Sequence, residues 1–208
     1  MNSHADAKVN VPTGTSGVWT VSRFTVDETA SFFTSLDSTF GSSRSVPAGE
    51  YTMLSRGRVT VMSDTPAEVR DHLPVIRRAH GSVLIVGLGL GMVARAIALK
   101  PEVTKVTVIE LSPDVIALTG PWLTALSPKV EIIQADIFAW SPPRGTKYEV
   151  AWFDIWDDLC SDNLPQMSTL HRKFARCAAW KGSWGRELTQ TYFTREKNRR
   201  GTSIFARR

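Results

Sequence analysis

The sequence predicts an α/β fold of the Rossmann-like, three-layer class, in which helices cover both faces of a mostly parallel sheet. Short apolar runs suited to buried strands alternate with helical stretches of about ten residues. A glycine or an acidic residue closely follows each run, at the edge where open α/β sheets bind ligands. Right-handed crossovers then predict the strand order 3-2-1-4. The runs are residues 83–86, 105–109, 130–133 and 148–153.

The segment before this pattern predicts a small N-terminal β element. Residues 1–17 are polar and rich in Gly, Thr and Ser, which predicts a loose arm. Residues 18–24 favour a strand, and residues 51–63 predict a hairpin with Gly57 in its turn. Pro66 in a first turn, with Glu68 close behind it, predicts a helix that ends near Ala79. We therefore expect residues 1–79 to form an arm, a hairpin and a linking helix.

Residues 80–208 are expected to form the Rossmann-like domain, with a basic C-terminal segment. After the fourth apolar run, residues 163–178 predict one helix and residues 180–186 predict a loop rich in Trp and Gly. This loop either covers the ligand site or packs against the preceding helix. Residues 188–193 fit a strand or the end of a helix. Because no further strand–helix–strand unit follows, we expect a small sheet that is truncated at its C-terminal side.

Composition excludes several classes of protein. The 208 residues are 42% hydrophobic and 22% charged, as in globular rather than disordered or fibrous proteins. The longest apolar stretch, residues 83–99, is interrupted by glycines and Arg95, so no membrane span is expected. Cys160 and Cys177 exclude a disulfide scaffold and offer no zinc spacing, so no metal is expected. The first ten residues lack an apolar signal core, which favours the cytoplasm.

Positive charge is concentrated at the C-terminal end. Residues 1–170 carry a net charge of −4, whereas residues 171–208 carry +9. A basic end on a mildly acidic body is typical of contact with nucleic acid or of a solvated helix and tail. No zinc finger or aromatic ribonucleoprotein motif accompanies it. Both interpretations stay open, and the sequence does not indicate an oligomeric state.

The glycine-rich turn after the first run is the first candidate binding element. Gly87, Gly89 and Gly91 permit a tight turn and let a ligand approach the main chain. The helix that follows presents free N–H groups, which favour a carboxylate or phosphate. The G-x-G-x-G spacing is typical of S-adenosylmethionine-type nucleosides, whereas the frame that starts at Gly89 and ends at Ala94 fits a dinucleotide. A plain turn without a ligand is the third alternative.

Two acids at the next strand ends extend this candidate site. Glu110 follows the second run, where a carboxylate can accept hydrogen bonds from both hydroxyls of a ribose. Asp136 follows the third run, where it can accept a hydrogen bond from an adenine amine while Ile137 and Phe138 enclose the ring. Asp136 would serve equally well as a helix N-cap. The three signals together support a bound nucleoside more strongly than any one of them does alone.

Residues 82–158 resemble class I S-adenosylmethionine-dependent methyltransferases, and among them the spermidine-synthase-like branch. The matching stretches are VLIVGLGLG, VTVIELSPDVI, QADIFAW and YEVAWFDIWDD, preceded by a hairpin and helix where that branch carries its N-terminal β element. The resemblance implies S-adenosylmethionine as the cofactor. It places the methionine part of that molecule on Gly87, Gly89 and Gly91, the ribose on Glu110 and the adenine on Asp136, with Ile137 beside it.

The acids after the fourth run are candidates for the acceptor side. Spermidine synthases carry two acids at the spacing of Asp154 and Asp157, and the resemblance assigns these two residues the catalytic role. An acidic cluster beside Trp152 and Trp156 favours an amine or cationic acceptor. Equally, the tryptophans could belong to the core and the acids could cap a helix. Lone histidines such as His72 are interpreted as structural.

The sequence therefore predicts an S-adenosylmethionine-dependent methyltransferase acting on a small-molecule acceptor. Leu90 replaces an acid of the spermidine-synthase glycine loop, and Ile155 and Trp156 replace small residues between the paired acids. These differences favour methyl transfer over aminopropyl transfer, which stays as the alternative within enzymes. A non-catalytic protein that binds a nucleoside, or nucleic acid through its basic end, is the alternative from another class.

Overall fold

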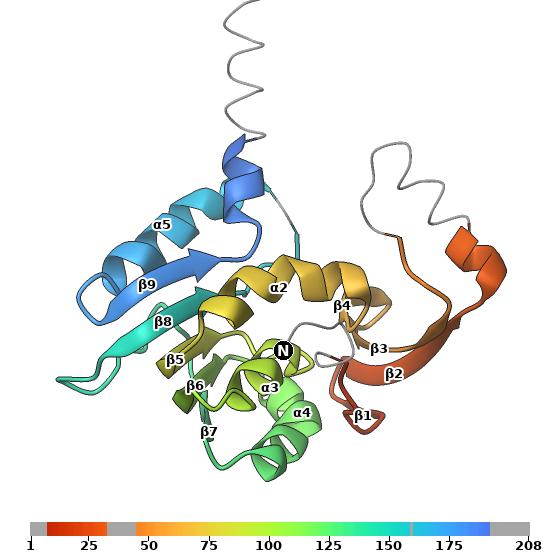
Figure 1. The fold of residues 1–208 in the computed structure, drawn as a ribbon, viewed down its shortest axis with the longest axis horizontal. Helices are drawn as coiled ribbons and strands as arrows, with labels where there is room; N and C mark the ends of the chain where they lie inside the picture. Colours follow the sequence, from red (N-terminus) through yellow and green to blue (C-terminus); the bar gives the residue numbers. More distant parts are fainter. Residues whose placement is uncertain (1–7, 33–44, 159, 192–208) are drawn as a thin grey trace, which may run out of the picture.

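The computed structural model describes residues 8–32, 45–158 and 160–191, which form two separate sheets joined by a long helix (Figure 1). The larger sheet has five strands in the order β7-β6-β5-β8-β9, and every neighbouring pair is parallel. This confirms the α/β class and the order predicted for the first four strands. The strands are β5 (Gly81–Val86), β6 (Val103–Glu110), β7 (Val130–Gln134), β8 (Tyr148–Phe153) and β9 (Ala178–Ser183).

The C-terminal part differs from the prediction because a fifth strand is present. The expected helix over residues 163–178 is replaced by the short turn η2 (Ser161–Asn163), helix α5 (Leu164–Lys173) and the start of β9. Most of the loop expected at residues 180–186 is strand, so the sheet is not truncated after four strands. Trp180 of β9 stacks on Trp152 of β8, with ring centroids 6.3 Å apart. Residues 186–191 are helical, and residues 192–193 lie outside the described part.

Helices cover both faces of the parallel sheet. Along β5, Val83 and Ile85 pack with α2 (Pro66–Arg78), α3 (Met92–Ala98) and α4 (Pro113–Leu126). Leu84 and Val86 face the other side and belong to the core that includes Leu170 of α5. A strand buried on both faces needs apolar residues at every position, which explains the uninterrupted run VLIV.

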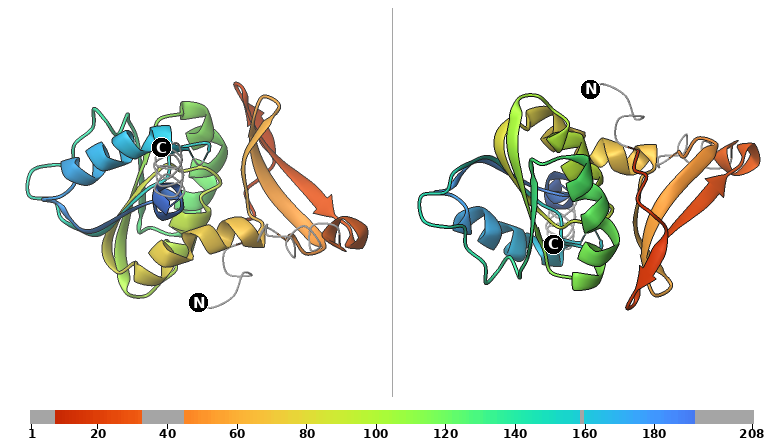
Figure 2. Two further views of the ribbon diagram at one scale, coloured as in Figure 1. Left: turned by 90° about the horizontal axis from the view of Figure 1, so that it is seen from above. Right: turned by 90° about the horizontal axis from the view of Figure 1, so that it is seen from below.

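The smaller sheet is antiparallel and stands beside the parallel one, as Figure 2 shows. The predicted hairpin is confirmed, and Gly57 in its turn has φ +60°. Residues 8–16, expected in a loose arm, are instead held: Val9 and Val11 are buried, and Val9 N donates to Asp64 Oδ2 at 3.1 Å. The sheet has the order β1-β2-β3-β4, with β1 (Gly14–Ser16), β2 (Trp19–Val26), β3 (Gly49–Arg56) and β4 (Val59–Ser63).

Two contacts fix the small sheet against the larger domain. Strands β1 and β2 pack on α4, where Ser16 Oγ donates to Asp114 Oδ1 at 2.7 Å. Helix α2 leads from β4 directly into the parallel sheet and packs against α3 and β8. The carboxyl ends of the parallel strands therefore face the inner side of the small sheet.

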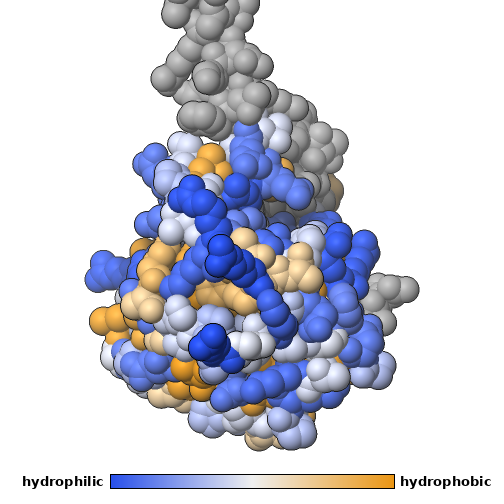
Figure 3. Space-filling view, turned by 90° about the vertical axis from the view of Figure 1, so that its left-hand side faces the viewer, coloured by the Kyte–Doolittle hydropathy of each residue, from blue (hydrophilic) through white to orange (hydrophobic). Residues whose placement is uncertain are grey.

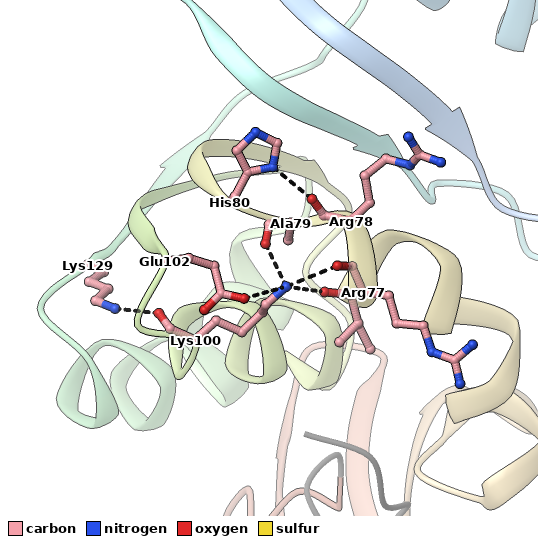
Figure 4. Close-up of polar contacts among 8 residues, drawn as sticks. Arg77, Arg78, Ala79, His80, Lys100, Glu102 and Lys129 are labelled. Carbon is pink, nitrogen blue, oxygen red and sulfur yellow. Dashed lines mark hydrogen bonds and ion pairs between the residues drawn. The ribbon is translucent and has the colours of Figure 1, made fainter.

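A buried lysine holds the end of α2. Lys100 lies just after α3, and its Nζ donates to the carbonyls of Ile76, Arg77 and Ala79 at 2.8, 3.3 and 2.6 Å (Figure 4). The same ammonium pairs with Glu102 at 3.2 Å. The last carbonyls of a helix lack partners within the helix, so a cation there satisfies them and complements the helix dipole. Lys100 thus ties the C-terminal end of α2 to the start of the parallel sheet.

The exterior around β9 and α5 mixes hydrophilic and apolar residues, as the space-filling view of this side shows (Figure 3). Within the described residues, no helix has the length and apolar character needed to traverse a bilayer. Of the basic C-terminal segment, residues 171–191 are described, whereas residues 192–208 lie outside the described part. The expectation of a nucleic-acid contact there stays a prediction.

Candidate functional site

A cavity of about 430 Å³ lies at the carboxyl edge of the parallel sheet and is closed from the other side by the small sheet and α2. A volume of this size lies within the range of small-molecule sites. All but one of the residues that the sequence nominated for a site line it, together with residues that it did not nominate. The nominated lining residues are Gly87, Gly89, Glu110, Asp136, Ile137, Asp154 and Asp157.

The glycine loop needs its glycines for three different reasons. Gly87 has φ +97°, and a Cβ on it would clash with the carbonyl oxygen of Asp154. A Cβ on Gly89 would clash with Met62 Sδ, which accepts a hydrogen bond from Leu90 N at 3.2 Å. Gly91 does not line the cavity; a Cβ there would meet Thr119 of α4 at 3.1 Å. Gly91 therefore serves the packing of α3 on α4.

Glu110 braces the glycine loop as well as facing the cavity. Its Oε2 accepts a hydrogen bond from Leu88 N at 2.7 Å, and its Oε1 accepts one from Ser112 N at 2.8 Å. Each carboxylate oxygen has a second lone pair, so the group can still accept from a ligand. The end of β6 and the turn after β5 are thus held together by the side chain predicted to bind ribose.

Asp136 and Ile137 lie beyond β7 at the same edge. Asp136 Oδ1 accepts from Phe138 N at 2.8 Å and so caps a turn, not the helix of the alternative interpretation, while Asp136 also lines the cavity. Lys173 of α5 was not anticipated here. Its Nζ donates to the carbonyls of Ile137 and Phe138 at 2.8 and 2.7 Å and holds this turn from the far side.

Asp154 occupies the opposite end of the cavity from Asp136. Its backbone N donates to Val86 O at 2.8 Å, which continues the sheet ladder, and Asp154 lines the cavity together with Gly87 and Gly89. The side chain is 24% exposed, to the cavity, and its Oδ2 lies 3.6 Å from His72 Nε2. Among the described residues, no lysine or arginine pairs with it. Burial first, and then the negative charges of Glu68 and Asp71, raise the pKa of Asp154 to about 7.

Asp157 is placed differently from what we expected. The resemblance assigned it a catalytic role together with Asp154, but the neighbouring acids that raise the pKa of Asp154 are Glu68 and Asp71 of α2. Asp157 instead pairs with Arg56 of β3, and both side chains are about half exposed at the mouth of the cavity. Arg56 also lies over the Trp19 ring, 5.5 Å from its centroid. This pair bridges the two sheets.

His72 is the residue that sequence reasoning missed. It lies on α2, is 3% exposed, lines the cavity, and stands edge-on to Trp152 with centroids 5.9 Å apart. Burial lowers the pKa of His72 to about 4, so the ring is neutral at pH 7. The spacing of Glu68 and His72, four residues apart on one face of a predicted helix, was the available signal.

Tryptophans from three segments complete the wall. Trp152 is 5% exposed and belongs to the core, as one interpretation had it, and it also lines the cavity. Its contact with an acceptor stays a prediction. Trp156 lines the cavity and donates from Nε1 to Gln166 Oε1 at 2.8 Å. Trp184, just after β9, lines the cavity as well, whereas Trp180 packs on Trp152. Residues 180–186 thus contribute Trp184 to the cavity wall and Trp180 to packing against β8, and a covering role over a ligand stays a prediction.

Groups that would hold a metal are absent from the described part of the chain, where no three His, Cys, Asp or Glu side chains gather. Cys160 and Cys177 are both free thiols. The chemistry available in the cavity is therefore that of carboxylates, one neutral imidazole, main-chain N–H groups and aromatic faces.

Comparisons with known proteins concern the fold. No protein-family model and no curated protein matches the sequence. Among solved structures, the 23S rRNA methyltransferase ErmE is 19% identical with a TM-score of 0.42, over 56% of this chain and 43% of that one. The N-methyltransferase NodS from Bradyrhizobium japonicum WM9 with S-adenosyl-L-homocysteine is 19% identical, TM-score 0.44, over 55% and 58%. Coclaurine N-methyltransferase is 19% identical, TM-score 0.41, over 54% and 31%. The match thus spans less than two thirds of each of these structures.

Proposed function

We propose that this chain is an S-adenosylmethionine-dependent methyltransferase that acts on a small amine or hydroxyl acceptor. The observation that carries the proposal is the arrangement of one cavity with two chemically different ends. One end combines the glycine loop, Glu110 and Asp136 at three neighbouring strand ends, and the other combines Asp154 with a neutral histidine and tryptophan faces.

The residues of the first end fit the donor. Glu110 offers free lone pairs on both carboxylate oxygens for the two ribose hydroxyls. Asp136 and Ile137 stand where an adenine amine and ring face would lie, with Phe138 41% exposed beside them. Gly87 and Gly89 keep side chains away from the main chain of the loop, so that a ligand can approach it. Met62, which rests on this loop, would contact the methionine part.

The residues of the second end fit the acceptor. Bound S-adenosylmethionine supplies a methyl group already activated by a positive sulfur. The protein then has to align the acceptor with that methyl group, which can contribute several kcal/mol to lowering the barrier, and to take up the acceptor's proton. Asp154 is the carboxylate nearest to the glycine loop at this end, and it is not neutralised by a cation among the described residues. Asp157, paired with Arg56, shapes the entrance.

Binding in solution tests this function. Isothermal titration calorimetry on the full chain should show S-adenosylhomocysteine bound more tightly than 5′-methylthioadenosine, because a methyltransferase retains contacts to the amino-acid part of the donor. The reverse preference would instead favour aminopropyl transfer. Binding of NAD without S-adenosylhomocysteine, or of a short DNA duplex alone, would contradict the proposal.

Transfer is tested separately from binding. The full chain is incubated with methyl-labelled S-adenosylmethionine and a panel of primary, secondary and aromatic amines and alcohols, and label in the acceptor is measured. Asp154→Asn should abolish transfer while S-adenosylhomocysteine still binds, since the change keeps the shape and removes the charge. Loss of binding in a folded Asp154→Asn protein would move Asp154 out of the acceptor role.

A further inference from the structure

His72 has no structural reason to be a histidine. Its Nδ1 is buried and lacks a hydrogen-bond partner among the described residues, and its Nε2 lies 3.6 Å from Asp154 Oδ2. Leaving a buried polar atom unpaired costs free energy, so a histidine that only fills space would be less stable than an apolar residue of its size. The orphan atom and the orientation of the ring toward the cavity both point to a function for the pair.

A neutral imidazole suits a carboxyl group that changes its protonation state. When Asp154 is ionised, Nε2–H of His72 can donate to Oδ2. When Asp154 carries a proton, Oδ2–H can donate to a bare Nε2, and the ring proton then sits on Nδ1. A lysine or arginine in place of His72 would hold the carboxylate ionised, and an apolar residue would hold it protonated. The imidazole serves both states without a net charge of its own.

The surroundings favour such a change. The titratable or charged groups around Asp154 are Glu68, Asp71 and His72 on α2, with the Arg56–Asp157 pair at the cavity mouth. Glu68 is held by Ser63, whose backbone N and Oγ donate to its two oxygens at 2.9 and 3.0 Å. These hydrogen bonds hold Glu68 in place, and its charge near Asp154 favours the protonated form of Asp154 until a cation enters the cavity.

We propose that His72 is a positioning residue that holds Asp154 through both of its protonation states, so that Asp154 accepts the acceptor's proton during methyl transfer. The inference rests on the proposed function. In the step, the acceptor nitrogen or oxygen gains a bond to the methyl carbon, the carbon–sulfur bond breaks with its electron pair left on sulfur, and the acceptor's proton passes to Asp154. Asp154 ends as a neutral acid that donates to His72.

This arrangement links the charge of the donor to the proton on Asp154. The positive sulfur of S-adenosylmethionine favours the carboxylate, so binding should expel the proton and leave Asp154 ready as a base. S-adenosylhomocysteine has no such charge, so after transfer Asp154 again favours its protonated form. The proton taken from the acceptor is therefore retained until the next donor binds.

Proton release on binding tests the inference without an acceptor. Calorimetry at pH 6 to 9, in pairs of buffers with different ionisation enthalpies, should show that S-adenosylmethionine binding releases a proton from the wild-type protein below about pH 7. Binding of S-adenosylhomocysteine should release none, and neither ligand should release a proton from Asp154→Asn.

Variants of His72 test its part in this release. In His72→Phe, the release should persist to a pH higher by about half to one unit, because a hydrogen bond to a carboxylate is about twice as strong as one to a neutral acid. His72→Gln, which can also donate or accept, should restore most of the wild-type behaviour.

His171 provides a matched control. Its pKa is also lowered to about 4, first by burial and then by the charges of Arg186 and Lys181, but its Nε2 contacts Ser183 Oγ at 2.9 Å and the ring does not line the cavity. His171→Gln should leave proton release unchanged. A folded His72→Phe protein with the wild-type release profile would make His72 structural and overturn the inference while leaving the methyltransferase proposal intact. Failure of the wild-type protein to bind S-adenosylmethionine would remove both.

A second measurement needs no variant of His72. In nitrogen-15-labelled protein, the two ring nitrogens of His72 should exchange roles as the pH rises through 7, with the proton moving from Nδ1 to Nε2 while the ring stays neutral. In Asp154→Asn the exchange near pH 7 should be absent. A wild-type tautomer that does not change across this range would overturn the inference even if the His72 variants fail to fold.

Discussion

The two ends of the cavity are assembled in different ways. The end that we propose for the donor comes from consecutive strand–helix units, and Glu110 there accepts hydrogen bonds from Leu88 and Ser112, 22 and 2 positions away. The acceptor end brings together three remote segments: His72 of α2 meets Asp154, and Arg56 of β3 meets Asp157 across 101 positions. A local arrangement follows from the fold class, whereas a remote one depends on how the small sheet docks. The parallel sheet alone therefore positions the residues proposed for the donor. The residues proposed for the acceptor come together only because α2 and the small sheet also pack against that sheet.

Gly87→Ala should have the largest effect, because Gly87 lies where the two ends meet. The new Cβ would clash with the Asp154 carbonyl oxygen, and φ +97° is itself unfavourable for alanine. We expect a loss of roughly 3 kcal/mol or more in the free energy of unfolding, measured by urea denaturation, and loss of S-adenosylhomocysteine binding.

Gly57→Ala is the control for Gly87→Ala. The φ of +60° at Gly57 carries a similar conformational cost, but a Cβ there would have nothing within 4 Å. It should cost only about 1 kcal/mol. Equal losses in the two variants would show that the junction tolerates a side chain.

Asp154 should make the protein less stable as the pH rises from about 4 to about 7. In the unfolded chain this carboxyl ionises near its ordinary pKa of 3.8, whereas in the folded protein it holds its proton to about pH 7. The folded state therefore binds more protons over this range, and stability falls by about 1.4 kcal/mol per pH unit. Relative to wild type, Asp154→Asn should gain about 2 to 3 kcal/mol between pH 5 and pH 8 in urea denaturation.

The histidines act in the opposite direction. His72 and His171 have lowered pKa values, so the unfolded chain binds more protons than the folded one below about pH 6.5 and stability falls as the pH decreases. Wild type and Asp154→Asn both contain His72 and His171. The contribution of these histidines to the free energy of unfolding therefore largely cancels when the two proteins are compared. A difference between wild type and Asp154→Asn that does not vary with pH would contradict the raised pKa of Asp154.

Glu110→Gln tests the donor end alone. The change keeps the size of the side chain but removes the charge that strengthens hydrogen bonds to a ribose, a loss of roughly 1.5–3 kcal/mol. It also leaves the backbone N–H of Leu88 or Ser112 without its acceptor, because an amide has one accepting oxygen. S-adenosylhomocysteine affinity should fall at least tenfold in calorimetry, while the proton release linked to Asp154 persists at saturating S-adenosylmethionine. The matched control is Glu131→Gln on the neighbouring strand β7, where Glu131 pairs with Lys105 at the surface. Unchanged affinity in folded Glu110→Gln would remove Glu110 from the site.

Arg56→Met should have the smallest effect. Arg56 and Asp157 are each about half exposed, and an exposed ion pair contributes at most about 1 kcal/mol to stability. The methionine chain can still cover Trp19. We expect the melting temperature to change by only a few degrees and S-adenosylhomocysteine affinity by less than threefold. A tenfold loss of S-adenosylhomocysteine affinity in Arg56→Met would mean that Arg56 contributes to donor binding.

The fold was predictable from the sequence as far as apolar runs reveal strands. Strands β5 to β8 are such runs, and their order follows from the right-handed crossover rule. Strand β9 was not predicted because its sequence AAWKGS contains no apolar run. Its place is determined by the stacking of Trp180 on Trp152, and Gly182 leaves room for these rings. The sequence of a single strand does not show which neighbouring strand it will pack against.

The site shows the same limit. Glu110, Asp136 and Asp154 were identifiable because each follows an apolar run, and the ends of parallel strands meet at one edge. His72 was not identified, because its four-residue spacing from Glu68 puts both side chains on one face of the helix but does not show what that face contacts. Gly91 has the spacing of a binding residue, yet the bulk of α4 around Thr119 decides its role. The partner of Asp157 depends on the docking of the hairpin, which no local pattern describes.

The lysine that holds the end of α2 has a mechanical consequence. Because Lys100 binds three carbonyls where α2 turns into β5, the helix cannot rotate about its axis without breaking all three bonds at once. A rotation by a single residue position, about 100°, would swing His72 out of the cavity. The α2 side of the cavity is thus fixed to the parallel sheet, whereas at the mouth Arg56 and Asp157 form an ion pair whose side chains are about half exposed. We expect a ligand to pass Arg56 while His72 keeps its place beside Asp154.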